Sequence, residues 1–294
     1  MIRRLAVIGV GLIGGSYARA LRAAGQVQEI VGCGRSRDNL ELAVKLGVID
    51  SYSHDIGAAV EGADLVFLAV PMGAIRAAFE AMKGHLADDA VITDGGSVKG
   101  SVIKDCTAVF GQMLPNFVPG HPIAGKEQHG VEASHASLYR NRRVILTPVC
   151  QTSEAAIAKV QASWRYCGAE VTRMFAVDHD RILGATSHLP HMLAYALVDM
   201  LARMDDKEEV FRYAAGGFRD FTRIASSNPV MWRDICLANS DQLAPLMEKF
   251  AAELQLLASS IRAGEQQRLE QIFANAKSTR DAYVDGVKSP DSPE

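Results

Sequence analysis

The stretch that decides the fold reads Val7-Ile8-Gly9-Val10-Gly11-Leu12-Ile13-Gly14-Gly15-Ser16. An apolar run precedes it and a helical pattern follows it, so its spaced glycines indicate the first turn of a Rossmann-type unit. Gly9 allows the tight turn, Gly11 lets the backbone approach a pyrophosphate, and Gly14 lets the helix pack closely on the strand. The anion then lies on the N–H groups at the helix start. We predict dinucleotide contacts at Gly9, Gly11, Leu12, Ile13 and Gly14.

Short apolar runs alternate with helical stretches through the first half of the chain. The expected strands are residues 4–8, 29–32, 65–69, 91–94 and 144–147, with helices over 13–24 and 40–46. This alternation predicts βαβ units and a mostly parallel sheet. From about Asp178 onward the chain is rich in helical pattern. We therefore expect an α/β Rossmann-type dinucleotide-binding domain (1–175), an all-α helical substrate and dimerisation domain (176–285) and a loose tail (286–294).

One apolar stripe in the second half has the spacing of a long helix face. Its members recur every three or four residues: Leu243, Leu246, Met247, Phe250, Leu254, Leu257 and Ile261. Such a stripe packs into a core or forms a seam between two copies of the chain. Both interpretations remain open, and the second predicts a homodimer.

The residues after the second expected strand bear on the choice of dinucleotide. An NAD site usually carries Asp or Glu there for the ribose 2′-OH, but this chain has Gly34 at that position. Arg35, Ser36 and Arg37 follow. Guanidinium groups bind a 2′-phosphate that a carboxylate would repel. The pattern favours NADP over NAD, although a solvated basic turn also explains it.

Composition excludes several classes of protein. The 294 residues carry a formal net charge of −3, so no dominant positive field is available for nucleic acid. No apolar run approaches the roughly 18 residues of a membrane helix. The five cysteines are scattered and form no Cys-x-x-Cys pair, so we expect no metal site and a reducing, cytoplasmic location.

Three segments concentrate functional groups: residues 93–99, 121–127 and 187–191. Each has an ordinary structural explanation when taken alone. Ser97 can cap a helix, and His121 can be a loop histidine bonded to backbone. His188 and His191 can be satisfied polar groups at a domain interface, at the head of a helix. Spacing alone therefore does not make any of them catalytic.

Together the segments resemble the prephenate/arogenate (cyclohexadienyl) dehydrogenases of tyrosine biosynthesis. The resemblance spans nearly the whole chain and includes the glycine loop, Ala69-Val70-Pro71, Asp94-Gly-Gly-Ser97-Val-Lys99, His121-Pro-Ile-Ala-Gly125, Ser187-His-Leu-Pro-His191 and Gly217-Phe-Arg-Asp-Phe-Thr-Arg223. The glycine loop occurs in many enzymes, whereas the last three segments in this order are far more specific. The family converts a cyclohexadienol with hydride transfer to NAD(P)+ and loss of carbon dioxide.

The resemblance assigns roles to individual residues. It implies that His121 is the base for the ring hydroxyl proton, because a neutral imidazole accepts a proton near neutral pH. Ser97 would orient His121 and that hydroxyl. Arg223 would bind a carboxylate through its forked donors, and His191 and Ser187 would help hold the substrate.

Further positions carry weaker implications. Glu127 matches a position near the substrate side chain, or forms a surface ion pair. Trp232 closes the pocket, or is simply core. The resemblance adds cofactor contacts at Val70, Pro71 and Gly95. The alternatives are another 3-hydroxyacid-dehydrogenase-like enzyme, for which we find no Gly-x-x-x-Lys segment in the second domain, and a non-catalytic dinucleotide sensor. Prephenate and arogenate are not distinguished.

Overall fold

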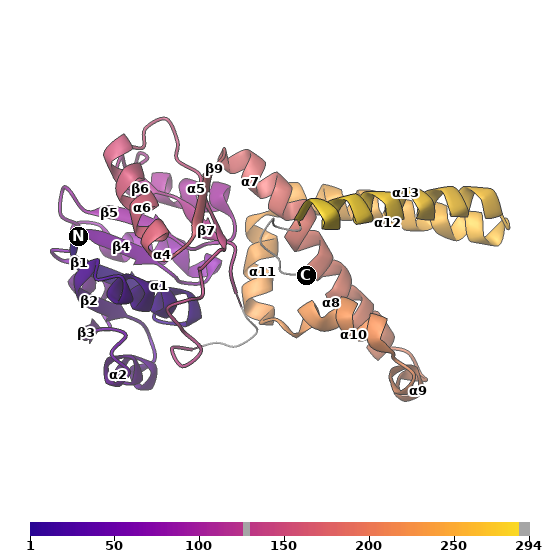
Figure 1. Ribbon diagram of the computed structural model, residues 1–294, viewed down its shortest axis with the longest axis horizontal. Coiled ribbons are helices and arrows are strands. Elements are labelled where there is room, and N and C mark those ends of the chain that lie inside the picture. Colours follow the sequence, from indigo (N-terminus) through magenta and orange to yellow (C-terminus); the bar gives the residue numbers. More distant parts are fainter. Residues whose placement is uncertain (126–129, 288–294) are drawn as a thin grey trace. The chain divides into compact units, whose positions relative to one another are not determined.

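A computed structural model describes residues 1–125 and 130–287 of the chain (Figure 1). Its main feature is a six-stranded sheet of order β3-β2-β1-β4-β5-β6. All neighbouring strands in it are parallel. The strands are β1 (Ile2–Ile8), β2 (Val27–Cys33), β3 (Ser51–Ser53), β4 (Leu65–Leu68), β5 (Val91–Asp94) and β6 (Phe117–Val118). The predicted Rossmann-type α/β domain is confirmed, since this is the doubly wound strand order.

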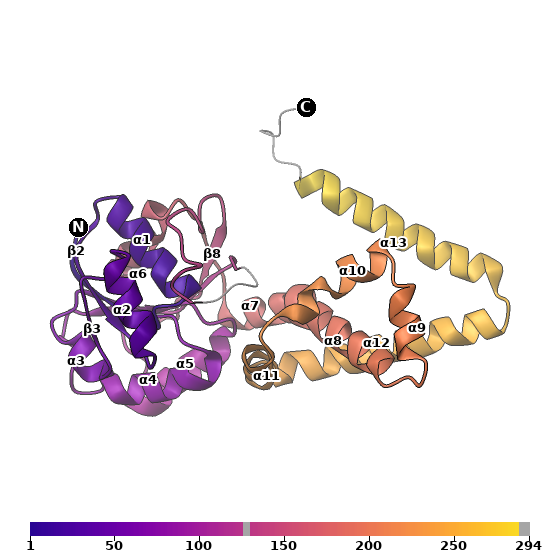
Figure 2. The same ribbon diagram turned by 90° about the horizontal axis from the view of Figure 1, so that it is seen from below.

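Helices cover both faces of this sheet (Figure 2). Successive strand side chains point to opposite faces, so Leu5 and Val7 pack in one core cluster and Ala6 and Ile8 in another. The first cluster includes residues of α1 (Leu12–Ala23), α2 (Arg37–Lys45) and α6 (Glu154–Tyr166). The second includes residues of α3 (Ile56–Val60), η1 (Met72–Ala74), α4 (Ile75–Met82) and α5 (Lys99–Phe110). Both faces are therefore buried, as the continuous apolar runs predict.

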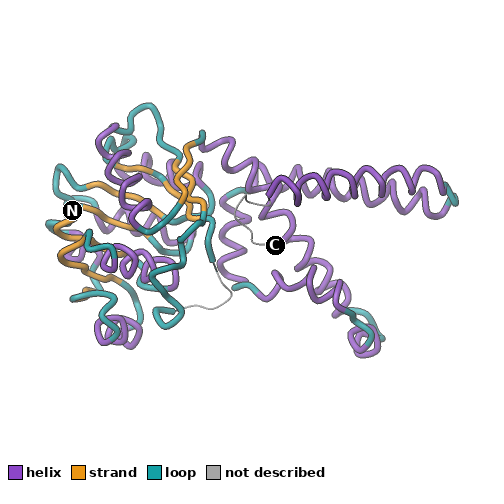
Figure 3. The backbone as a smooth tube through the Cα atoms, viewed as in Figure 1, coloured by secondary structure: helices purple, strands orange, loops and turns teal. Residues whose placement is uncertain are grey.

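A second, three-stranded sheet corrects two expectations (Figure 3). It contains β7 (Gly120–Pro122), β8 (Arg143–Leu146) and β9 (Glu170–Arg173). The run at 144–147 was expected in the parallel sheet, but it pairs antiparallel with β7 and parallel with β9. His121 was expected in a loop, but it lies in β7 opposite Ile145. The reason is that β7 has only three residues, follows Pro119 and ends at Pro122, so the sequence shows no periodicity there.

The rest of the described chain is helical. The helices are α7 (Ala176–Leu183), η2 (Gly184–His188), α8 (Leu189–Ala202), α9 (Lys207–Arg212), α10 (Gly216–Thr222), η3 (Arg223–Ser226), α11 (Pro229–Ala238), α12 (Ser240–Arg262) and α13 (Gln266–Val287). Contacts divide the chain into compact units of residues 1–243 and 244–294. The division falls inside α12, beside Pro245. Proline has no backbone N–H and so cannot donate a helical hydrogen bond. None of the described helices is long and apolar enough to span a membrane.

Candidate active site

Three segments that carry predicted cofactor residues directly follow adjacent strands of the sheet. The Gly9 N–H donates to Cys33 O (2.8 Å), that of Ala69 to Ile8 O (2.7 Å) and that of Gly95 to Leu68 O (2.8 Å). These bonds align the segments after β1, β4 and β5, and β1 lies where the strand order reverses. Open α/β sheets bind ligands at this position. The loops carrying Gly9, Val70 and Gly95 are thus brought together.

The glycine loop leaves room for a ligand at one position and none at two others. Gly9 has φ +100°, and a Cβ there would lie 2.3 Å from Ala69 O. A Cβ on Gly14 would lie 2.1 Å from Gly9 O, so both glycines are required by packing. A Cβ on Gly11 would meet nothing within 4 Å. Gly11 is also the N-cap of α1 and leaves it without a side-chain cap, which fits a dinucleotide pyrophosphate.

The basic segment after β2 is only partly committed to other contacts. The Ser36 Oγ accepts from Asn39 N at 3.3 Å and caps α2. Arg37 Nε donates to Glu41 Oε1 at 2.7 Å, and this hydrogen bond lowers the pKa of the Glu41 carboxyl. Arg35 is exposed, and the structure gives it no partner among the described residues. A 2′-phosphate binding to Arg37 would therefore compete with Glu41, whereas one binding to Arg35 would displace no ion pair among the described residues.

A fully buried ion pair anchors the backbone next to His121. The Lys99 ammonium contacts Asp94 Oδ2 and donates to Gly120 O at 2.7 Å. The Gly120 N–H donates to Asp94 Oδ1 at 3.0 Å. Burial lowers the pKa of Lys99, while the Asp94 charge opposes that shift. The pair holds both polar groups of Gly120, and so fixes the backbone from which His121 projects.

The His121 side chain belongs to a chain of hydrogen-bonded groups. Its Nδ1 lies 2.9 Å from Nε2 of His179, whose Nδ1 lies 2.7 Å from Asp180 Oδ1. The Asp180 carboxylate also accepts the N–H groups of Lys99 (2.8 Å) and Gly100 (2.7 Å) at the start of α5. Asp180 therefore joins α7, α5 and the His121 site.

These surroundings shift the pKa values of several groups. Burial lowers the pKa of His121 well below its usual range, and His179 and Lys99 lower it further. Burial lowers the pKa of His188 to about 4. Burial alone would raise the pKa of Asp180, but hydrogen bonds from His179 and from backbone N–H groups lower it overall. His121 is thus neutral at physiological pH and able to accept a proton.

The second group of predicted residues surrounds Trp232. The His191 ring stacks on Trp232 with centroids 3.6 Å apart, and its Nδ1 lies 2.8 Å from Ser187 O. Burial lowers the pKa of His191, and the charge of Arg223 lowers it as well, so Arg223 lies near. Trp232 is 6% exposed and belongs to a core cluster, yet its Nε1 has no hydrogen-bond partner among the described residues.

Asn239 connects the two groups. Its Nδ2 lies 3.0 Å from Asp180 O and 3.0 Å from His188 Nδ1.

Ser187 and His188 were expected at the head of a helix, but they lie in η2, a π-helical turn between α7 and α8. Pro190 follows at the first turn of α8, where its missing N–H explains a widened turn.

Several residues stand differently from the sequence-based expectation. Ser97 is half-buried before α5 and is not its cap, because Val98 is the N-cap residue. The structure records no hydrogen bond between Ser97 and His121, whose Nδ1 contacts His179 instead. Glu127 lies outside the described residues. Sequence reasoning gave no role to Lys99, His179, Asp180 or Asn239. The local signals were the segment of residues 94–99, which contains Lys99, and the His179-Asp180 pair at the start of the helical half.

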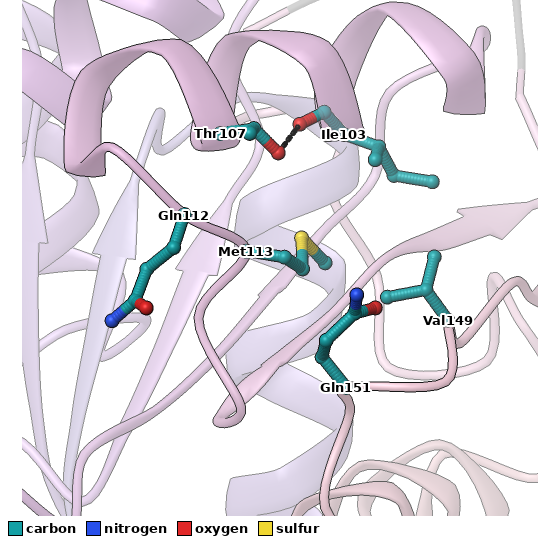
Figure 4. A pocket seen from close by; sticks show the side chains of 6 residues that line it. All are labelled: Ile103, Thr107, Gln112, Met113, Val149 and Gln151. Carbon is teal, nitrogen blue, oxygen red and sulfur yellow. Dashed lines mark hydrogen bonds between the residues drawn. The ribbon is translucent and has the colours of Figure 1, made fainter.

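A separate pocket is not part of this site (Figure 4). Its volume is about 470 Å³, and it is lined by Ile103, Thr107, Gln112, Met113, Val149 and Gln151. The Thr107 hydroxyl donates to Ile103 O at 2.9 Å within α5. None of the predicted site residues lines the pocket. In the described part of the chain, no group of three or more His, Cys, Asp or Glu is placed to hold a metal ion.

A Rossmann-type sheet with an open glycine loop, and a histidine site formed by β7 and the following helices, are typical of dinucleotide-dependent dehydrogenases. The sequence matches two protein-family models. The prephenate dehydrogenase nucleotide-binding domain matches residues 17–173, and the prephenate dehydrogenase dimerization domain matches residues 176–275. The chain belongs to the prephenate dehydrogenase family, and it is an NAD(P)-dependent oxidoreductase.

Individual relatives agree with this assignment. The cyclohexadienyl dehydrogenase of Zymomonas mobilis is 39% identical over 95% of this chain and 96% of its own length. The prephenate dehydrogenase of Bacillus subtilis is 34% identical over 93% of this chain and 74% of its own. The crystal structure of Aquifex aeolicus prephenate dehydrogenase with hydroxyphenyl propionate and NAD+ has a TM-score of 0.89 at 37% identity, covering 96% of this chain and 99% of that one.

Proposed function

We propose that this enzyme oxidatively decarboxylates prephenate, arogenate or both, with hydride transfer to NAD(P)+. The observation that carries the proposal is a half-buried, neutral His121, anchored through Gly120 beside the carboxyl ends of the sheet strands. Its relatives include proteins named for prephenate, cyclohexadienyl and, in a Synechocystis structure at 27% identity and TM-score 0.80, arogenate dehydrogenase activity. The products would be 4-hydroxyphenylpyruvate or tyrosine.

His121 is the base in this mechanism. Bound oxidised nicotinamide supplies the hydride acceptor. His121 takes the proton of the ring hydroxyl. The electron pair of the broken O–H bond becomes the carbonyl π bond as hydride leaves C4, the ring carbon that carries the hydroxyl. Carbon dioxide then leaves C1, the ring carbon that carries the carboxylate, and the electrons of the broken C–C bond make the ring aromatic. The proton returns from His121 to the phenolate oxygen, so the base is regenerated.

The remaining site residues bind and orient the substrate. Arg223 provides a forked cation for a carboxylate, beside His191, whose pKa its charge lowers. Ser187, His191, Glu127 and Trp232 complete the substrate contacts. The Nδ1 of His121 contacts His179, so the substrate hydroxyl binds at Nε2 of His121. Ser97 orients the substrate hydroxyl at that nitrogen.

NADP is the preferred cofactor in this proposal. Gly34 stands where a carboxylate would repel a 2′-phosphate, and the exposed Arg35 has no competing ion pair among the described residues. Ser36 and Arg37 complete the phosphate contacts. The decisive experiment is a steady-state comparison of prephenate and arogenate, each with NAD+ and NADP+. Activity with neither substrate would refute the proposed reaction, and equal efficiency with both cofactors would refute the NADP preference.

The enzyme works as a cytoplasmic homodimer in this proposal. Its helical half matches a dimerization-domain model, and the apolar stripe exposes Met247, Leu254 and Ile261 in the single chain. Burying such a stripe against a second copy removes it from water. Sedimentation at micromolar concentration should give twice the 31.7 kDa chain mass. A species of one chain alone would refute the dimer.

A further inference from the structure

The histidine pair His121–His179 ends at a carboxylate, and this fixes where protons sit. The Asp180 carboxylate only accepts hydrogen bonds, and its pKa is lowered, so a neutral His179 carries its proton on Nδ1. Nε2 of His179 is then an acceptor, 2.9 Å from His121 Nδ1. His121 must therefore carry its own proton on Nδ1. This leaves its Nε2 with a free lone pair.

We propose that His179 and Asp180 are positioning residues that hold His121 in the tautomer whose Nε2 accepts the substrate proton. The proposal rests on His121 being the base of the proposed function. When Nε2 takes the proton, the imidazolium keeps its Nδ1–H on His179, and no proton moves to Asp180. A carboxylate that orients an imidazole without being protonated is sufficient for such catalysis.

The neighbouring contacts make this arrangement rigid. His179 is fully buried, and Asp180 is held by the N–H groups of Lys99 and Gly100 at the start of α5. The same Lys99 binds Gly120 O through its side chain. Lys99 thus fixes both ends of the hydrogen-bonded chain from His121 to Asp180. Its side chain holds the backbone before His121, and its backbone N–H holds the carboxylate that follows His179.

The tautomers can be read directly by nitrogen NMR on the full-length protein labelled with ¹⁵N-histidine, above pH 7.5, with single substitutions for assignment. His121 and His179 should both show a protonated Nδ1 and an unprotonated Nε2. His188 is the internal contrast, because its Nδ1 accepts from Asn239 and its proton belongs on Nε2. A proton on Nε2 of His121 or of His179 would overturn the proposal whether or not the enzyme turns over prephenate.

Kinetics supply a second test that a merely structural role would not satisfy. His179→Leu removes the acceptor for the His121 N–H, so kcat should fall roughly ten- to hundredfold with KM nearly unchanged, as for a misplaced catalytic group. His179→Gln supplies an amide oxygen as acceptor and should restore most of kcat. Equal losses in both variants, or no loss in His179→Leu, would contradict the positioning role. Near-native kcat in His121→Asn would refute His121 as the base, whereas the tautomers read in the unsubstituted protein test the positioning role independently of that result.

Discussion

The glycine loop and the His121 site are built in opposite ways within one compact unit. The loop is made of backbone from one contiguous stretch, and its two tight contacts are steric: a Cβ at Gly9 or Gly14 would lie 2.3 Å or 2.1 Å from a carbonyl oxygen. The His121 site is made of side chains drawn from β7, α5, α7 and the segment after α11. Gly9 and Gly14 therefore tolerate no larger residue, whereas the His121 site tolerates no buried polar group without a partner.

This difference predicts how each region fails. An added atom in the loop moves backbone and displaces the cofactor. A lost partner in the His121 site leaves a buried polar group without its hydrogen bond, at a cost of about 1–3 kcal/mol, and more for a charge. The following substitutions test the polar side of that contrast, from the largest expected effect to the smallest, and end at the exposed basic segment after β2.

His121→Asn should lower kcat by roughly two to four powers of ten, the usual contribution of a positioned general base. The native profile of kcat/KM should lose activity as pH falls through a pKa below about 6.5, because burial lowers the pKa of His121. That limb should be absent from the variant. Near-native turnover in His121→Asn would show that another group is the base.

Arg223→Ala is the matched comparison for that variant. A carboxylate anchor acts in the ground state and the transition state alike, so KM should rise while kcat changes little. Steady-state kinetics with varied substrate separates the two constants. Abolished kcat with unchanged KM would reverse the assigned roles of Arg223 and His121.

Lys99→Met should destabilise the fold by about 3–5 kcal/mol, because it leaves the buried Asp94 carboxylate without its cation. Urea unfolding measures this loss. Lys104→Met is the control, since Lys104 is exposed on the same helix and should change stability by no more than about 0.5 kcal/mol. Equal effects in the two variants would mean that the ion pair does not anchor Gly120.

Stability should also depend on His188. Its folded pKa is about 4, against about 6.5 for an unfolded histidine. The unfolded chain binds this proton first, so stability is complete above about pH 6.5 and decreases by about 3 kcal/mol as pH falls to 4. His188→Gln should flatten this dependence in urea unfolding between pH 7 and 4.5. An unchanged slope would show that His188 is not kept neutral by the fold.

The smallest effect is expected at the basic segment after β2. Arg35→Ala should lower kcat/KM with NADP+ roughly tenfold and leave NAD+ nearly unchanged, because exposed charges contribute little. Arg37→Ala should do less, since Arg37 already bonds Glu41. A greater loss in Arg37→Ala would mean that Glu41 releases Arg37 to the cofactor.

The sequence predicted the histidine that we propose as the base, but not its partner. The resemblance of the segment around His121 to a known family suggested the base, and the glycine spacing was sufficient to place the cofactor loop. Neither gave the strand β7, which is only three residues long. Nor did any spacing connect residue 121 with residue 179, because 58 positions separate them.

By itself, the sequence determined the alternation of strands and helices and the cofactor turn, because these depend on local periodicity and on backbone sterics. Its motifs, taken together, indicated the family by resemblance. Only the tertiary structure decided which buried groups meet. It placed the Asp94–Lys99 pair around Gly120 and Asp180 behind His179. The physical reason is that a buried polar side chain must find a partner wherever the packed chain supplies one, and that partner need not be near in sequence.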